Sequence, residues 1–209
     1  MNFPSFFTDA PRLKLRDPLS AFLGTSEGGI LEYGYEDAVR LAGHSCPAVA
    51  GAYLMVINGL AYLHDDEMPE RGGIEVFMRG ERDQGTTGVL ASVATLLTGA
   101  APETGFGGIG PAQRFSRRNL LHFGADIEGT VALRRRDTGA GVVVDIDTGA
   151  VPHAAAMSAV MPQAVAGEAD EAGLESFAAL WQDRVRRMLI EHADDPKLIH
   201  LYDWSPAGA

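Results

Sequence analysis

The pattern of apolar and polar residues divides the chain into short helices and short strands. Apolar residues recur at helical spacing in five segments, and three of these end at a glycine, which commonly terminates a helix. The segments cover residues 17–24, 35–44, 47–64, 88–99 and about 174–192. The third, PAVAGAYLMVINGLAYLH, is small or apolar on nearly every face, which predicts a helix buried through the middle of the domain.

Strand patterns are fewer and shorter. Residues 72–80 are bounded by glycines, and residues 124–135 and 141–149 are joined by the turn-forming sequence RDTGA. Residues 150–173 show no strand pattern and predict a helical turn followed by a linker. Few strands with mixed connections favour the α+β class, with a small, mostly antiparallel sheet packed with helices.

These elements divide the chain into three parts. Residues 1–16 form an N-terminal arm, interrupted by Pro4 and Pro11, whose three phenylalanines need to dock on the core or on a second copy of the chain. Residues 17–149 form the α+β core. Residues 150–209 are a linker and a C-terminal helix, which we expect to pack on the core or on the partner in a homodimer.

Composition and charge restrict the partners. The 209 residues are 46% hydrophobic and 22% charged, as in soluble globular proteins. A net charge of -11 repels a nucleic-acid backbone, so we expect a small-molecule ligand and no nucleic acid. A single cysteine cannot form an intramolecular disulfide, the chain starts without a secretory signal pattern, and its longest apolar stretch is interrupted and short. These features predict a cytoplasmic protein that does not enter a membrane.

The segment His44-Ser45-Cys46-Pro47 contains that single cysteine. The residue before a proline favours extended backbone, and in an extended segment His44 and Cys46 face the same way. Because Pro47 begins a helix, the Cys46 sulfur is expected near unpaired backbone N–H groups, which favour the thiolate. An imidazole and a thiolate suit zinc, iron or copper better than magnesium or calcium. The alternative is that Cys46 is a small buried side chain that packs at the start of the helix.

The sequence GHSCPAVAGAYL resembles the signature of the formylmethanofuran dehydrogenase FmdE-like family. The later order of a strand, an apolar helix ending in Thr-Gly, a glycine-rich loop and further strands is also similar, over residues 17–147. The resemblance implies an α+β homodimer with a cleft in which His44 and Cys46 bind a metal such as zinc. It further implies a metal-dependent enzyme of one-carbon or related metabolism, with Cys46 and His44 at its catalytic centre.

The chain departs from the family pattern at three points. The helix at 88–99 (GVLASVATLL) lacks the second cysteine and the aspartate of that family, and the loop at 107–110 (GGIG) lacks its lysine. The tail with paired cysteines found in some members is also absent from this sequence. The resemblance therefore supplies two ligands, without the residues that usually accompany them.

A zinc site needs at least one more protein ligand. His122 is the first candidate because it lies in an element that should border the cleft; three weaker candidates are Asp83, Glu103 and His153. Each of these side chains has an ordinary structural role as the alternative. A glycine-punctuated segment at 79–88, RGERDQGTTG, predicts either a site for a substrate oxyanion or a surface turn.

Two further groups of residues are candidates for binding a cofactor. Arg114 and Arg117, with Arg118, form a basic cluster that would attract an anionic group, unless they are solvated or paired with acids. Tyr53 would line an apolar pocket if the cofactor were haem, bound through the Cys-Pro dipeptide.

Four hypotheses follow for the function. The first is a zinc-binding or iron-binding FmdE-like protein built on His44 and Cys46. The second is a haem-binding protein, and the third is a thiol enzyme without a metal, with Cys46 as nucleophile and His44 as its partner. The fourth is a non-catalytic accessory protein, which the missing cysteine and lysine favour.

Overall fold

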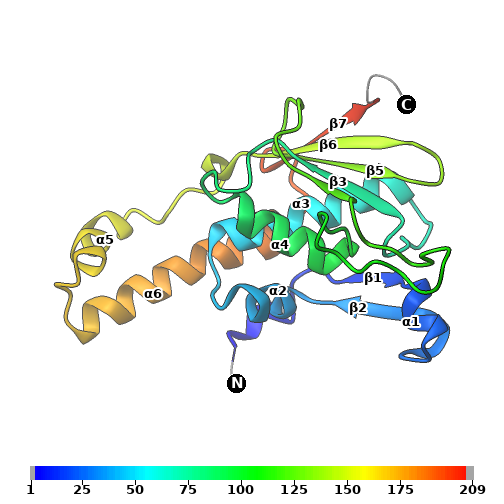
Figure 1. Ribbon diagram of the computed structural model, residues 1–209. Coiled ribbons are helices and arrows are strands. Elements are labelled where there is room, and N and C mark those ends of the chain that lie inside the picture. Colours follow the sequence, from blue (N-terminus) through cyan, green and yellow to red (C-terminus); the bar gives the residue numbers. More distant parts are fainter. Residues whose placement is uncertain (1–2, 206–209) are drawn as a thin grey trace.

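The computed structural model describes residues 3–205, which form an α+β fold (Figure 1). One sheet has five strands in the order β4-β3-β5-β6-β7, and a second sheet consists of β1 and β2. The strands are β1 (Leu13–Arg16), β2 (Ile30–Tyr33), β3 (Ile74–Met78), β4 (Leu121–His122), β5 (Val131–Arg135), β6 (Gly141–Ile146) and β7 (Ile199–Trp204). Only the β3–β4 pair is parallel within these sheets, so the predicted fold class with a mostly antiparallel sheet is confirmed.

Six α-helices lie within the described residues. They are α1 (Pro18–Phe22), α2 (Tyr35–Ala42), α3 (Pro47–His64), α4 (Thr87–Thr98), α5 (Met157–Ala166) and α6 (Glu171–Arg186), and α6 continues into a π-helical turn, Arg187–Glu191. Figure 1 shows the five-stranded sheet as one layer, α3 and α4 beneath it, and the β1–β2 ribbon on the far side of these helices.

Helix α3 is the centre of the core, as its composition predicts. It begins at Pro47 and ends at His64, and it lies directly against the sheet because two glycines face the strands. A Cβ on Gly51 would lie 2.7 Å from Ile146 Cδ1, and a Cβ on Gly59 would lie 2.7 Å from Leu133 Cδ1. The sequence predicts that this stretch is too short and interrupted to cross a membrane, but by length and composition alone α3 could do so. In the structure 61% of the stretch is buried inside the protein, and buried core helices of soluble proteins have the same length and composition.

The ends of several helices follow the predicted signals. The Asp17 side chain caps α1, where it accepts hydrogen bonds from Leu19 N at 2.8 Å and Ser20 N at 3.3 Å. Gly43 and Gly99 end α2 and α4 in the left-handed conformation, both with φ of 76°. Local sequence therefore determines these boundaries.

The two ends of the chain contain structure that the sequence pattern did not predict. Residues Leu13–Arg16, expected within an irregular arm, pair with β2, and Phe7 is buried in the chain's own core. At the other end, β7 pairs with β6 and completes the sheet that was expected to lie within 17–149. Helix α5 stands where a helical turn and a linker were predicted. Both strands are short and depend on pairing with another segment of the chain, so their own patterns gave weak signals.

The hairpin formed by α5 and α6 projects from the body of the molecule (Figure 1). Met157 is the one buried residue of α5, and Val185 is the one buried residue of α6. The chain rejoins the core through Met188 and Leu189 in the π-helical turn, which are both fully buried. The outer part of the hairpin is therefore stabilised chiefly by the packing of its two helices on each other.

Candidate functional site

The loop between α2 and α3 presents the predicted pair. Cys46 is extended, with φ of -150° and ψ of 168°, as expected for a residue before proline. Its Sγ accepts a hydrogen bond from Val49 N at 3.5 Å, so the sulfur lies at the N-terminus of α3. Cys46 is half-buried and His44 is exposed. The loop thus presents one accessible imidazole and one partly accessible thiol.

The orientation of the His44 ring follows from one hydrogen bond. Nδ1 lies 3.0 Å from the carbonyl oxygen of Ala42, which can only accept, so Nδ1 carries the proton and Nε2 has a free lone pair. Histidines that ligate metals typically donate their other ring N–H to a carbonyl in this way. His44 also lines a cavity of about 230 Å³, which we call the histidine cavity. Its walls are Leu41, Ala42, His44, Gly88, Val89, Ser92 and Val93.

Ser45, between the two candidate ligands, is held by side chains from two helices. Its Oγ lies 3.0 Å from the Tyr35 hydroxyl and donates to Gln182 Oε1 at 2.9 Å. Its carbonyl oxygen accepts from Trp181 Nε1 at 3.2 Å and from Gln182 Nε2 at 3.1 Å. Burial raises the pKa of Tyr35, so its hydroxyl stays protonated. We call this set the Ser45 contacts; they fix the backbone between His44 and Cys46.

The Ser45 contacts were not predicted from the sequence. Trp181 fits the packing face of the last helix, and Gln182, next to it, gives no signal of its own. The hydrogen bonds join residues separated by 136 and 137 positions, and no local pattern reports such a pairing. The polar residue between the two candidate ligands was the single available hint.

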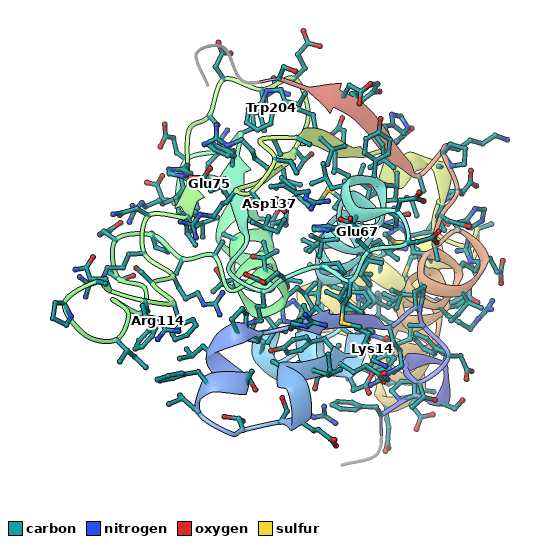
Figure 2. The ribbon with its side chains drawn as sticks, turned by 90° about the vertical axis from the view of Figure 1, so that its right-hand side faces the viewer. Lys14, Glu67, Glu75, Arg114, Asp137 and Trp204 are labelled. Carbon is teal, nitrogen blue, oxygen red and sulfur yellow. The ribbon has the colours of Figure 1, made fainter. Side chains whose placement is uncertain are left out.

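His122 does not lie with the other two predicted ligands. It is paired in register with Phe77, and because side chains alternate across a strand, both point away from the face of the sheet that packs on α3. The His122 ring stacks on Phe77 at 4.7 Å between centroids, and its Nε2 lies 3.9 Å from Glu75 Oε1. Glu75 and Trp204 mark this outer face in Figure 2.

No three-ligand set is formed by the residues that the structure describes. Within 3–205, no group of three or more His, Cys, Asp or Glu side chains is arranged to hold a metal ion. Glu103 instead pairs with Arg82 at 2.8 Å, and this hydrogen bond lowers the pKa of Glu103 to about 2. Asp83 is exposed in the turn before α4.

His153 lies near the Ser45 contacts. Its ring packs on Trp181 at 5.6 Å between centroids, and Arg184 Nη1 lies 2.7 Å from its Nε2. Burial, and then the charges of Arg184 and Arg187, lower the pKa of His153. It therefore supports the base of α6 as a neutral ring that accepts from Arg184.

The predicted cofactor-binding arginines have separate surroundings. Arg117 is 6% exposed and donates from Nη2 to Asp17 Oδ1 at 2.7 Å. Arg114 is exposed on the loop beside α1 (Figure 2), with its guanidinium over the rings of Phe22 at 5.1 Å and Phe115 at 4.7 Å. Arg118 is exposed and donates to the Gly105 carbonyl at 2.9 Å. The three arginines are therefore not one cluster.

Tyr53, the predicted wall of a haem pocket, is fully buried in the core. Its hydroxyl lies 2.6 Å from the Pro11 carbonyl oxygen and 3.2 Å from the Tyr33 carbonyl oxygen. These contacts tie α3 to the N-terminal sheet. Tyr53 thus has no face open to a ligand in this structure.

Three solved protein chains are similar to this chain, whereas no protein-family model and no curated protein sequence matches it. One of the three is described as a tungsten formylmethanofuran dehydrogenase FmdE-like protein from Syntrophus aciditrophicus, with a TM-score of 0.41 and 16% identity. The match covers 83% of this chain and 73% of that chain. This neighbour bears the name of the family that the GHSCP motif resembles; at this similarity it supports no argument about function.

The donor set of the loop fits two positions of a transition-metal site. His44 offers Nε2 and Cys46 offers Sγ, which are ligand types that zinc prefers. The described residues supply no third protein ligand to this pair. The histidine cavity, at about 230 Å³, is smaller than the ~300–1,000 Å³ of most ligand pockets, so it offers no space for a porphyrin.

Proposed function

We propose that the protein binds a transition metal, zinc first among the candidates, through His44 Nε2 and Cys46 Sγ. The observation that supports this most directly is the hydrogen bond between His44 Nδ1 and the Ala42 carbonyl, because it leaves Nε2 with its lone pair free. The other positions on the metal would be filled by water, by a small-molecule substrate or by a second copy of the chain. A bound zinc ion would supply Lewis-acid chemistry, which polarises a carbonyl or activates water.

The chain's own residues would position the two metal ligands and provide space for a substrate. The Ser45 contacts hold the backbone between the two ligands, and the histidine cavity beside His44 offers space for a small substrate. Its wall is mostly apolar, with the Ser92 side chain as a polar group, although the Ser92 hydroxyl donates to the Gly88 carbonyl at 2.8 Å. A small, mainly apolar substrate with a single carbonyl would suit this space.

The test is metal analysis of the purified protein beside His44→Ala and Cys46→Ala. We expect near-stoichiometric zinc in the wild type and its loss in both variants, with zinc retained in the control His122→Ala. A wild-type protein that contains no metal and shows no saturable zinc binding would contradict the proposal. A strong visible absorption band would instead point to the haem alternative.

We also propose that the protein forms the predicted homodimer, through the α5–α6 hairpin. Helices in proteins are stabilised mainly by packing of an apolar face, yet Val165 is 75% exposed and Leu174 is 48% exposed on this hairpin. A second copy of the hairpin would cover both side chains, and the contact would be self-complementary.

Light scattering tests the homodimer. The wild type should give twice the monomer mass of 22.2 kDa, and Leu174→Glu should shift the mass toward the monomer. Leu23→Glu, at a leucine that is 61% exposed at the end of α1, is the matched control and should stay dimeric. A wild-type mass of 22.2 kDa would overturn this part of the proposal.

A further inference from the structure

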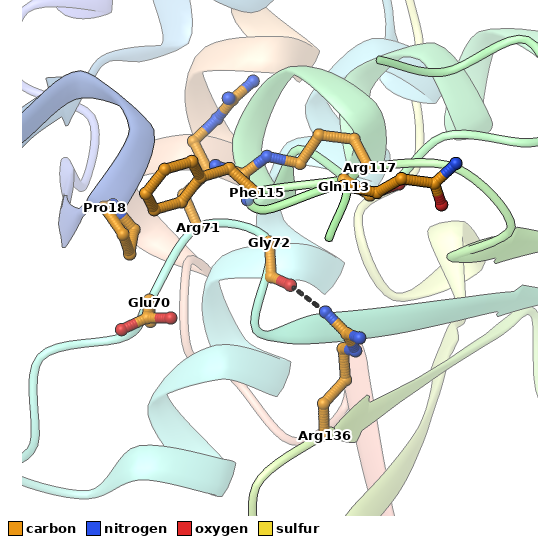
Figure 3. A pocket seen from close by; sticks show the side chains of 9 residues that line it. Pro18, Glu70, Arg71, Gly72, Gln113, Phe115, Arg117 and Arg136 are labelled. Atoms are coloured by element: carbon orange, nitrogen blue, oxygen red, sulfur yellow. Dashed lines mark hydrogen bonds between the residues drawn. The ribbon is translucent and has the colours of Figure 1, made fainter. Parts of the chain in front are cut away.

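A second cavity, of about 280 Å³, lies at the C-terminal end of α4 (Figure 3). Three arginines from three different segments line it, namely Arg71, Arg117 and Arg136. Figure 3 shows their side chains around Gly72, with the Phe115 ring beside them. We call it the arginine cavity. Three guanidinium groups around one space are unexpected in a chain with a net charge of -11.

The arginines outnumber the carboxylates that neutralise them. Arg71 Nη1 and Arg117 Nη2 bind the same carboxylate, that of Asp17, at 3.1 Å and 2.7 Å. Asp17 Oδ1 also caps α1, so its oxygens are shared between two cations and two backbone N–H groups. Arg136 donates to the Gly72 carbonyl at 3.0 Å, and within residues 3–205 no acidic side chain forms an ion pair with it.

Glu70 is the other carboxylate at this place. It lines the arginine cavity but is exposed, and among the described residues it makes no ion pair with the three arginines. Three positive charges therefore face two negative ones, of which only Asp17 is buried. A small bound anion would neutralise the excess positive charge of the three arginines.

Arg117 has unused hydrogen-bonding capacity although it is buried. Its side chain is 8% exposed, and its Nε is buried without an acceptor. Burial, together with the neighbouring charge of Arg71, lowers the pKa of Arg117, as expected for a cation with too little negative charge around it. A buried donor without an acceptor is rare in native proteins and calls for an explanation such as a contact to a ligand.

The backbone around the cavity adopts unusual conformations. Gln113 and Phe115, both in the wall, have φ of 47° and 63°, a region that residues with side chains seldom adopt. Gly72 has φ of 87°, and a Cβ there would overlap Arg117 Nη1. Such conformations concentrate at ligand sites, where the surrounding structure enforces them. The Arg114 guanidinium packs on Phe115 and holds the ring in place as an apolar wall.

We propose that the arginine cavity binds a small organic anion, whose carboxylate or phosphate lies between Arg117 and Arg136 and whose apolar part packs on Phe115. Guanidinium groups recognise both oxyanions through paired N–H donors. The volume restricts the ligand to one small ring or a short chain, because it lies near the lower end of ligand pockets, roughly 300 Å³. This site is independent of the zinc proposal, since it lies at the other end of α4.

Titration calorimetry tests the proposal with benzoate, phenyl phosphate and inorganic phosphate, and with benzyl alcohol as the uncharged probe. We expect at least one anion to bind with a dissociation constant of about 1 mM or lower. Benzyl alcohol should not bind. The comparison of benzoate with phenyl phosphate identifies the preferred oxyanion, and that of phenyl phosphate with inorganic phosphate measures the contribution of Phe115.

Arg136→Gln is the decisive variant, because Arg136 is outside the buried Asp17 pairs and its loss should leave the fold intact. Affinity should fall by about tenfold or more, and Arg136→Lys should recover part of it. The matched control is Arg118→Gln, an exposed arginine of the same segment as Arg117, which should bind as the wild type does. Absence of saturable binding by all three anions, or equal affinity in Arg136→Gln, would overturn the proposal.

Discussion

At the N-terminal end of α4, the histidine cavity is bordered by an exposed imidazole, whereas at its C-terminal end the arginine cavity is built on a guanidinium that is almost wholly buried. Helix α4, whose 12 residues span roughly 18 Å, runs between the two. The backbone between His44 and Cys46 is held by the Ser45 contacts, which come from other helices. Arg71 and Arg117 are themselves part of the buried ion-pair network on Asp17.

The difference separates two ways of positioning charged or reactive groups. The Ser45 contacts support an exposed loop, so we expect substitutions of the residues that make them to change ligand affinity while the fold persists. Where the functional groups are themselves buried, we expect substitutions to lower the free energy of unfolding, because an unpaired buried charge is strongly unfavourable. Substitutions at Gly72, Gln182 and His64 test this difference, and the largest effect is expected at Gly72.

Gly72→Ala should destabilise the protein by about 3 kcal/mol or more, because the new Cβ displaces Arg117 from its buried pair with Asp17. Urea unfolding followed by circular dichroism measures the loss. Gly110→Ala is the control: its φ is also positive, at 70°, but a Cβ there meets no atom within 4 Å. Its free energy of unfolding should fall by only roughly 1–2 kcal/mol, which is the cost of placing a residue with a Cβ in the left-handed conformation. Equal losses at both positions would show that Arg117 is not held as described.

Gln182→Ala should weaken zinc binding by about tenfold with little effect on stability, because it removes two of the Ser45 contacts. Competition with a zinc chelator measures the affinity, and urea unfolding measures the stability. Gln163→Ala, at an exposed glutamine of α5, is the matched control and should bind zinc as the wild type does. Unchanged affinity in Gln182→Ala would mean that the Ser45 contacts do not position the pair.

His64, at the end of α3, gives the region beside the arginine cavity a dependence on pH, because it lines a neighbouring cavity that shares Glu70, Gly72 and Arg136. Its Nε2 is buried without a partner, and burial together with the charge of Arg135 lowers its pKa. The charged groups around it are Glu67, Glu70, Arg135, Arg136 and Asp137. Because the unfolded chain binds the proton more readily, the stability from the neutral ring is complete above the ordinary pKa of about 6.5 and is lost as pH falls below it.

His64→Gln should therefore lose less stability than the wild type when the pH is lowered from about 7.5 to about 5. The pKa of His153 is lowered too, so the substitution removes only part of the acid sensitivity. His200→Gln, at a half-buried position of the edge strand β7, is the control. Thermal unfolding at several pH values provides the measurement, and parallel curves for wild type and His64→Gln would contradict the assignment.

Local sequence determined the features that depend on neighbouring residues. The glycines at 43 and 99, the Asp17 cap and the apolar stretch from Pro47 to His64 were all interpretable because a helix is built from contacts within a few positions. The extended conformation of Cys46 followed in the same way from the proline after it. For these elements the structure agrees with the expectation almost residue for residue.

The remaining features depend on pairings across the chain. His122 was predicted beside His44 because its segment was expected to border the cleft, but a two-residue strand gives no pattern from which its face can be determined. The ion pair of Asp17 with Arg117 spans 100 positions, and the cap role of Asp17 concealed its second role. Arg117 was predicted to bind an anion together with Arg114. That the two side chains have separate surroundings could not be predicted without the fold.

Helix α6 joins the projecting hairpin to the loop that bears His44 and Cys46. Its N-terminal end lies out at the tip beside α5, and Trp181 and Gln182, near its other end, bind the Ser45 carbonyl. Because an α-helix is stiff along its axis, we expect a displacement of the tip to reach these two side chains. The fluorescence of Trp181, measured in a Trp204→Phe variant, would then report whatever binds or moves the hairpin.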